Sequence, residues 1–225
     1  MKRNIAGRHR VIQMQLTQKI LQIGMQPDAM NSRPRVDNSS DHVVVVDAND
    51  IPIGTVPKLD AHRYGLRHRA ISVVIGDQNG RILLHQRAAG KYHSGGLWTN
   101  TCCSHPRPAE RASDAAARRL TEEMGISCPL FFMFAMNYRA EVSNGLVEDE
   151  IVHVFGGRFD GAPIPDLLEI SDWCWKPFGE IERHVHARPD LYTVWFLKLC
   201  NEFWSGIGKA LYSTVIEPNV PERSE

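Results

Sequence analysis

The stretch ASDAAARRLTEEMGI, residues 112–126, decides how this 225-residue chain folds. Its apolar positions recur every four residues, as along one face of a helix: Ala112, Ala116, Leu120 and Met124. Gly125 follows as a helix stop, and Pro106 and Pro108 break the chain before the helix begins. The stretch therefore predicts an amphipathic helix that packs one face against another layer.

The residues around this helix form short apolar runs separated by turns, such as the Gln-Asn-Gly turn at 78–80. Strands are expected at 43–46, 71–75, 82–84, 97–103, 130–139, 147–159 and 173–175. A further apolar helix is expected at 190–211. Strands grouped around a few helices predict an α+β fold in which a mixed β-sheet is packed between α-helices.

The N-terminal residues differ in charge from the centre of the chain. Residues 1–35 hold seven basic residues and one acid, so residues 1–36 are predicted to be a flexible basic extension, with a targeting peptide as the alternative. Residues 37–215 are predicted to form the working domain, and 216–225 a flexible tail.

Composition excludes several classes of function. Lys+Arg and Asp+Glu both number 26, which gives no reason to expect nucleic acid or an anionic membrane as a partner. No run approaches the roughly 18 uncharged apolar residues of a membrane helix. The five cysteines are odd in number, and Cys102 and Cys103 are neighbours, which favours a reduced compartment and predicts a cytoplasmic protein.

Residues of the types that commonly bind metal ions occur together at three places in the sequence. Side chains alternate along a strand, so Glu148 and Glu150 share a face, as do Cys103 and His105 if 99–105 is extended. A turn between His62 and His68 could bring two imidazoles together. Three histidines and two glutamates would make a mixed nitrogen and oxygen shell, compatible with Mn²⁺, Mg²⁺ or Zn²⁺.

Residues 118–126 resemble the helix of a Nudix box, Arg-Glu-apolar-x-Glu-Glu-x-Gly-apolar, and Glu110 stands where that box expects an acid. Two residues depart from it: Arg119 replaces a glutamate, and Ser104 replaces the leading glycine. A Nudix hydrolase uses clustered helix carboxylates to hold the metals that polarise a diphosphate for attack by water. Arg119 places positive charge there, which argues against a standard hydrolase.

Over about residues 41–200 the chain resembles the type I isopentenyl diphosphate isomerases, a non-hydrolytic Nudix branch. The motifs that carry the resemblance occur in the family's order. They are Lys58-Leu-Asp-Ala-His62, Leu66-Arg-His-Arg-Ala70, Trp98-Thr-Asn-Thr-Cys-Cys-Ser-His-Pro106, Tyr138-Arg139, Val147-Glu-Asp-Glu150 and the region of Trp195.

The resemblance implies a set of ligands. One divalent metal would be held by His62, His68, His105, Glu148 and Glu150, with Mn²⁺ or Mg²⁺ favoured over Zn²⁺. A Mg²⁺ that arrives with the diphosphate would lie near Glu123. The diphosphate would contact Lys58, Arg87, Lys91 and Arg119, and Trp195 would face the isoprenoid tail.

The implied activity interconverts isopentenyl diphosphate and dimethylallyl diphosphate by protonation and deprotonation through a tertiary carbocation. Cys103 and Glu150 would be the acid–base pair, with Tyr138 beside the carboxylate; which of the two gives the proton stays open. The alternatives are a Nudix hydrolase of a nucleoside diphosphate derivative and a metal-dependent binding protein without activity. The expected partner is a small isoprenoid diphosphate, and the oligomeric state is open.

Overall fold

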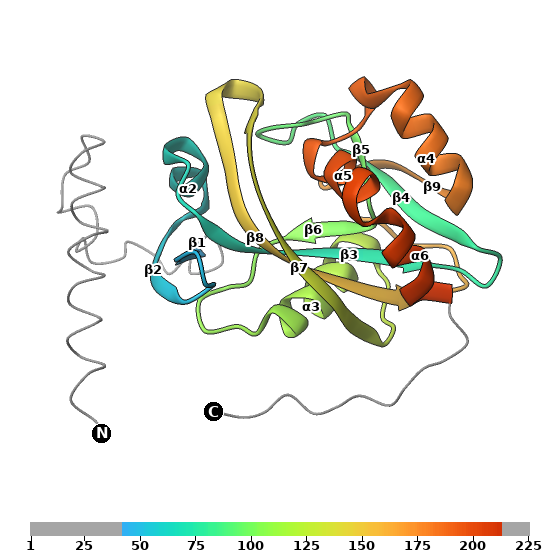
Figure 1. The fold of residues 1–225 in the computed structure, drawn as a ribbon, viewed down its shortest axis with the longest axis horizontal. Coiled ribbons are helices and arrows are strands. Elements are labelled where there is room, and N and C mark those ends of the chain that lie inside the picture. The colour runs from blue at the N-terminus through green and yellow to red at the C-terminus, as the bar shows by residue number, and fades with distance from the viewer. Residues whose placement is uncertain (1–41, 213–225) are drawn as a thin grey trace.

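The computed structural model describes residues 42–212 of the 225-residue chain (Figure 1). The extension predicted for residues 1–36 and the tail predicted for 216–225 lie outside these residues. Within 42–212, no helix is long and apolar enough to cross a membrane.

The strands of the described chain join in one mixed sheet. They are β1 (His42–Val46), β2 (Pro52–Pro57), β3 (His68–Gly76), β4 (Arg81–Arg87), β5 (Trp98–Thr99), β6 (Cys102–Ser104), β7 (Leu130–Val142), β8 (Leu146–Arg158) and β9 (Ile170–Pro177). The helices are α2 (Lys58–Tyr64), α3 (Ala112–Met124), α4 (Phe178–Ala187), α5 (Val194–Lys198) and α6 (Trp204–Tyr212).

Strand β3 is the centre of the sheet. It runs parallel to β8, with His68 opposite Glu150, and antiparallel to β6, with Ser72 opposite Cys103. Strand β8 also forms a long antiparallel hairpin with β7, in which Tyr138 lies opposite Glu150. This register places residues from β3, β6, β7 and β8 around one point of the sheet.

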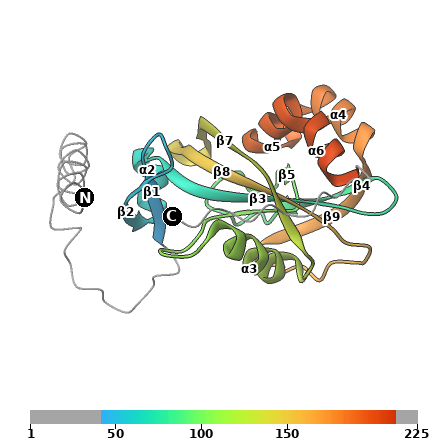
Figure 2. The same cartoon turned by 60° about the horizontal axis from the view of Figure 1, so that its bottom comes forward.

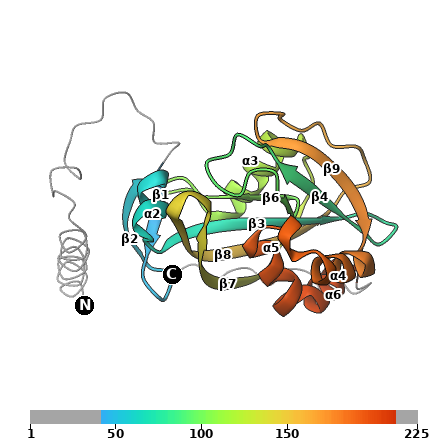
Figure 3. The same cartoon turned by 90° about the horizontal axis from the view of Figure 1, so that it is seen from above.

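Helices cover the sheet on both sides. Figures 2 and 3 show α3 on one side and α4, α5 and α6 on the other. Leu120 and Met124 of α3 are fully buried in one apolar cluster, while Phe196 and Trp204 belong to the cluster on the opposite side. The predicted α+β class, with a mixed sheet packed between helices, is confirmed.

The helices α2 and α4 were not expected from the sequence. Helix α2 has seven residues, too few for a hydrophobic period to be visible. Helix α4 buries only Ile181 and Val185, four positions apart. The helix expected at 190–211 is present as one continuous helical run from Val194 to Tyr212, in which the π-helical turn Leu199–Phe203 separates α5 from α6.

Candidate active site and metal centre

A pocket that is partly open to solvent lies beside β3, β6 and the β7–β8 hairpin. The site residues predicted from the sequence line it, apart from the fully buried His62 and His68: Lys58, Arg87, Lys91, Cys103, His105, Arg119, Glu123, Tyr138, Glu148, Glu150 and Trp195. The structure therefore brings the predicted residues together, and their roles stay predictions.

Three imidazoles converge at one end of the pocket. His62 lies on α2, which ends at Gly65 with a left-handed φ of 57°, and the chain then turns directly into β3, whose first residue is His68. His105 follows β6, and its Nε2 lies 3.2 Å from Nε2 of His68. The short turn predicted between His62 and His68 therefore does bring these rings together, with centroids 4.8 Å apart.

The tautomers of two rings follow from their backbone contacts. Nδ1 of His62 lies 2.6 Å from the carbonyl oxygen of Lys58, and Nδ1 of His68 lies 2.8 Å from that of Leu66. A carbonyl only accepts, so each Nδ1 donates a proton. In the neutral rings, both Nε2 atoms therefore present lone pairs to the centre of the cluster.

The carboxylates of β8 face these lone pairs. Oε2 of Glu148 lies 3.3 Å from Nε2 of His62, and Oε1 of Glu150 lies 3.3 Å from Nε2 of His68 and 2.9 Å from that of His105. Oε2 of Glu148 is buried without a hydrogen-bond partner. Buried lone pairs that face one another are unfavourable unless a cation lies between them. The arrangement therefore fits a divalent metal.

Four of the five predicted ligands each offer one nitrogen or oxygen atom, and these atoms lie within 4.8 Å of one another: His62, His68, His105 and Glu150. Glu148 falls in a second group, with His62 and His93. The two groups share His62, so the five predicted residues form one continuous set, and His93 adjoins it.

The charges in this cluster are coupled. Burial would lower the pKa of His68, but the hydrogen bond and charge of Glu150 raise it when no metal is bound. Burial would likewise raise the pKa of Glu150, but the hydrogen bond and charge of the protonated His68 lower it to about 2. Burial, together with the charges of His68 and His62, lowers the pKa of His105. An ionised carboxylate and a neutral imidazole are the forms that bind metal ions.

Two further proton-bearing groups lie in the pocket. The hydroxyl of Tyr138 donates to Oε2 of Glu150 at 2.9 Å, and burial, followed by the negative charge of Glu150, raises the pKa of Tyr138. The thiol of Cys103 lies 3.2 Å from Oδ1 of Asn100, and burial raises its pKa to about 12. Cys102, one residue earlier, instead packs in the cluster under α3, as strand alternation predicts.

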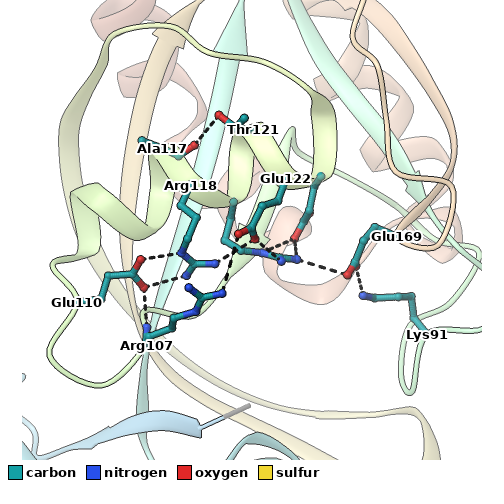
Figure 4. Close-up of polar contacts among 10 residues, drawn as sticks. Lys91, Arg107, Glu110, Ala117, Arg118, Thr121, Glu122 and Glu169 are labelled. Carbon is teal, nitrogen blue, oxygen red and sulfur yellow. Dashed lines mark hydrogen bonds and ion pairs between the residues drawn. The ribbon is translucent and has the colours of Figure 1, made fainter. Parts of the chain in front are cut away.

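Cations line another part of the pocket. Lys91 pairs with Glu169 (Figure 4). Arg119 pairs with Glu123 and, at 3.4 Å, with Glu169. Nε of Arg87 is buried and has no hydrogen-bond partner among the described residues. A buried donor without an acceptor is costly unless an anion supplies one. This part of the pocket therefore fits a phosphate group.

Arg119 and Glu123 lie on the face of α3 that lines the pocket. Arg118, elsewhere on this helix, takes part in a second set of ion pairs. Arg118 binds both oxygens of Glu110, at 2.7 and 2.8 Å, and Glu122 at 3.0 Å (Figure 4). The hydrogen bonds from Arg118 lower the pKa of Glu110. The carboxylates that align with a Nudix box are therefore matched by arginines rather than left open to a metal.

Trp195 lies on α5 at the apolar side of the pocket. Its side chain is 6% exposed, and Nε1 donates to Oγ1 of Thr99 at 2.8 Å. The guanidinium of Arg87 lies 5.2 Å from the centre of the Trp195 ring. The indole therefore has a fixed orientation between the cationic and apolar parts of the pocket.

Three ionisable residues of the pocket were missed by sequence reasoning: Tyr92, His93 and Glu169. All three lie in loops, where the alternation that relates strand neighbours does not apply. The only available signal was the adjacency of Tyr92 and His93 to Lys91.

The chain is similar to known proteins in sequence and in fold. The NUDIX domain family model matches residues 66–195. Isopentenyl-diphosphate Delta-isomerase 1 of Aromatoleum aromaticum is 51% identical over 160 residues, which is 71% of this chain and 90% of that protein. Isopentenyl-diphosphate Delta-isomerase of Burkholderia multivorans is 49% identical over 156 residues, 69% of this chain and 89% of that protein.

A solved structure, that of DR0079 from Deinococcus radiodurans, has a TM-score of 0.60 at 15% identity and covers 71% of this chain and 96% of that chain. This likeness concerns the fold alone. Together, the fold and the domain match define a protein of the Nudix class. Within that class, the chain belongs to the isopentenyl-diphosphate Delta-isomerase family.

Proposed function

We propose that this protein is an isomerase that interconverts isopentenyl diphosphate and dimethylallyl diphosphate. The observation that carries the proposal is one pocket that holds the Cys103 thiol, the Tyr138–Glu150 pair and a cluster of phosphate-binding cations. The named isomerases at about half identity support the same activity.

The reaction needs two proton transfers and no redox change. A proton added to the terminal alkene carbon creates a tertiary carbocation, and loss of a different proton from the neighbouring CH₂ group moves the double bond. Cys103 and Glu150 are the groups that give and take these protons. Tyr138, which donates to Glu150, holds that carboxylate in position and can relay its proton.

His62, His68, His105, Glu148 and Glu150 would hold one divalent cation. Mn²⁺ or Mg²⁺ is favoured over Zn²⁺, because two carboxylates and three imidazoles suit a coordination number above four. The cation would supply positive charge that changes the proton affinity of Glu150 and of the phenol beside it. Glu123 is the carboxylate placed to contact a Mg²⁺ that arrives with the diphosphate.

The substrate's two ends fit the two parts of the pocket. Arg87, Lys91, Arg119 and Lys58 would bind the diphosphate, and the buried Nε of Arg87 would gain its missing acceptor. The face of Trp195 would stabilise the passing carbocation, an interaction worth about 2 kcal/mol or more when desolvated. The same indole would exclude water, which would otherwise trap the cation as an alcohol.

The cytoplasm is the proposed location. All five cysteines lie within the described residues and are free thiols. Free thiols persist in a reducing compartment.

The test is incubation of the purified protein with isopentenyl diphosphate, Mg²⁺ and Mn²⁺ in deuterated water, with the products followed by NMR. We expect dimethylallyl diphosphate that carries deuterium. No exchange and no product under reducing, metal-replete conditions would refute the proposal. Phosphate release from a nucleoside diphosphate derivative would instead favour the hydrolase, which the arginine-paired carboxylates of α3 oppose.

A further inference from the structure

His93 is a buried histidine that the proposed reaction does not use. Its exposed fraction is 3%, and it lies in the loop between β4 and β5. Its Nε2 lies 3.0 Å from Oε1 of Glu148, and its Nδ1 lies 3.2 Å from Oγ of Ser94. The Ser94 hydroxyl can donate to Nδ1, which leaves the Nε2 proton directed at the carboxylate.

The main chain around His93 is held from two sides. Nη2 of Arg87 donates to the carbonyl oxygen of His93 at 3.2 Å, and the amide of Ser94 donates to Oγ of Ser143 at 2.9 Å. Ser143 follows β7, so the loop is tied to β4 and to the β7–β8 turn. The imidazole therefore has a fixed place beside Glu148.

We propose that His93 is a positioning residue of the metal centre, donating from Nε2 to Oε1 of Glu148 so that Oε2 faces His62 and the metal. The inference rests on the proposed metal site and adds an outer partner to it. Ligating carboxylates are commonly held by such hydrogen bonds, which fix the oxygen that the metal receives. Of the two oxygens of the buried Glu148, Oε2 has no hydrogen-bond partner in the described chain, and Oε1 lies 3.0 Å from Nε2 of His93.

The geometry favours this role over that of a ligand. His93 groups with His62 and Glu148, but the group of four that includes His68, His105 and Glu150 does not contain it. The two oxygens of Glu148 face different rings, Oε1 toward His93 and Oε2 toward His62. His93 therefore lies on the outer side of the carboxylate.

The experiment measures metal binding without substrate. Metal-free wild type, His93→Ala and His93→Gln are titrated with Mn²⁺, and free Mn²⁺ is followed by its EPR signal. We expect His93→Ala to keep one site per chain and to bind about 10–100-fold more weakly, the usual cost of losing an outer-shell partner. Glutamine keeps an N–H donor near the position of Nε2, so His93→Gln should stay within a few-fold of wild type.

The matched control is His153→Ala, on the opposite face of β8, where His153 pairs with Asp50. It should leave Mn²⁺ affinity unchanged. Circular dichroism of each metal-free variant checks that the fold is retained, and the rescue by glutamine separates positioning from a general loss of packing.

Three results would overturn the inference. Unchanged affinity in His93→Ala would show that Glu148 needs no such partner, and loss of the site in both His93 variants would make His93 a ligand. If wild type itself bound no Mn²⁺ and His68→Ala changed nothing, the proposed metal site would fail, and this inference with it. Isomerase turnover of wild type, measured separately, distinguishes these failures from failure of the proposed activity.

Discussion

Two groups of carboxylates in this protein have opposite surroundings. Glu110, Glu122 and Glu123, on or before α3, are all paired with Arg118 or Arg119. Glu148 and Glu150, on β8, face imidazoles instead. Figure 4 shows the first group as a chain of ion pairs. An arginine already neutralises a carboxylate, whereas an imidazole with a free lone pair leaves room for a cation between the two groups.

This contrast explains how a protein with a Nudix-class fold can catalyse a reaction that consumes no water. A hydrolase needs metals beside the diphosphate to activate the attacking water. Here arginines pair with the carboxylates of α3, of which Glu123 alone is proposed to contact a Mg²⁺ that arrives with the diphosphate. The proposed ligands of the other metal lie next to Cys103 and Tyr138, where protons would be moved.

Removal of the Cys103 thiol should have the largest effect. Cys103→Ala loses one of the two groups proposed to transfer protons, so turnover should fall by about 10²–10⁴-fold, the usual contribution of a general acid or base. The measurement is the rate of deuterium incorporation by NMR. Cys128→Ala, which alters a half-buried cysteine packed near α3, should keep wild-type turnover, and equal rates in both variants would refute the role of Cys103.

Removal of the metal should lower the stability of the protein, and this effect should depend on the proposed ligand His68 and not on the carboxylates of α3. A ligand at 100 times its Kd stabilises the folded state by about 2.7 kcal/mol, so Mn²⁺ should raise the Tm of the metal-free protein. His68→Ala should abolish this shift, because it removes a ligand. Glu122→Gln should leave it intact; a shift lost in Glu122→Gln and kept in His68→Ala would place the metal on the helix.

The two arginines of α3 should differ in their effect on substrate binding. Arg119 lines the pocket, and a hydrogen bond to a charged group is worth about 1.5–3 kcal/mol, so Arg119→Ala should raise KM by about 10–100-fold. Arg118→Ala should lower Tm and leave KM near wild type, because Arg118 pairs with Glu110 and Glu122. Steady-state kinetics would contradict this division if both variants raised KM equally.

The smallest expected effect concerns pH and the Glu110–Arg118 pair. Hydrogen bonds from Arg118 lower the pKa of Glu110 in the folded state, so the pair stabilises the protein above the unfolded pKa of the carboxyl, and this stability is lost as pH falls through the folded pKa. Glu110→Gln should therefore cost about 1 kcal/mol at pH 7 and progressively less in acid. Urea unfolding across pH measures this.

The control is Asp114→Asn, because Asp114 forms an exposed pair with Arg111. The effect of this substitution on the free energy of unfolding should depend less on pH. A cost of Glu110→Gln that stayed constant down to pH 2 would contradict the assignment.

Regular elements made much of the fold and site predictable. Strand alternation separated Cys102 from Cys103 and placed Glu148 with Glu150, because side chains of one strand have a fixed period. The helix at Ala112–Met124 followed from its apolar period and Gly125. His93 and Glu169 could not be found this way, since their positions depend on loops held by Arg87 and Lys91 from elsewhere in the chain.

The parallel pairing of His68 with Glu150 also bears on the order of folding. These two residues begin the ladder between β3 and β8, yet nearly half of the described residues lie between them in the chain. Such non-local pairing is slow to form, because the intervening loop must close before the contact is gained. The proposed metal ligands should therefore assemble late, and the rate of metal uptake during refolding would report completion of the sheet rather than collapse of the chain.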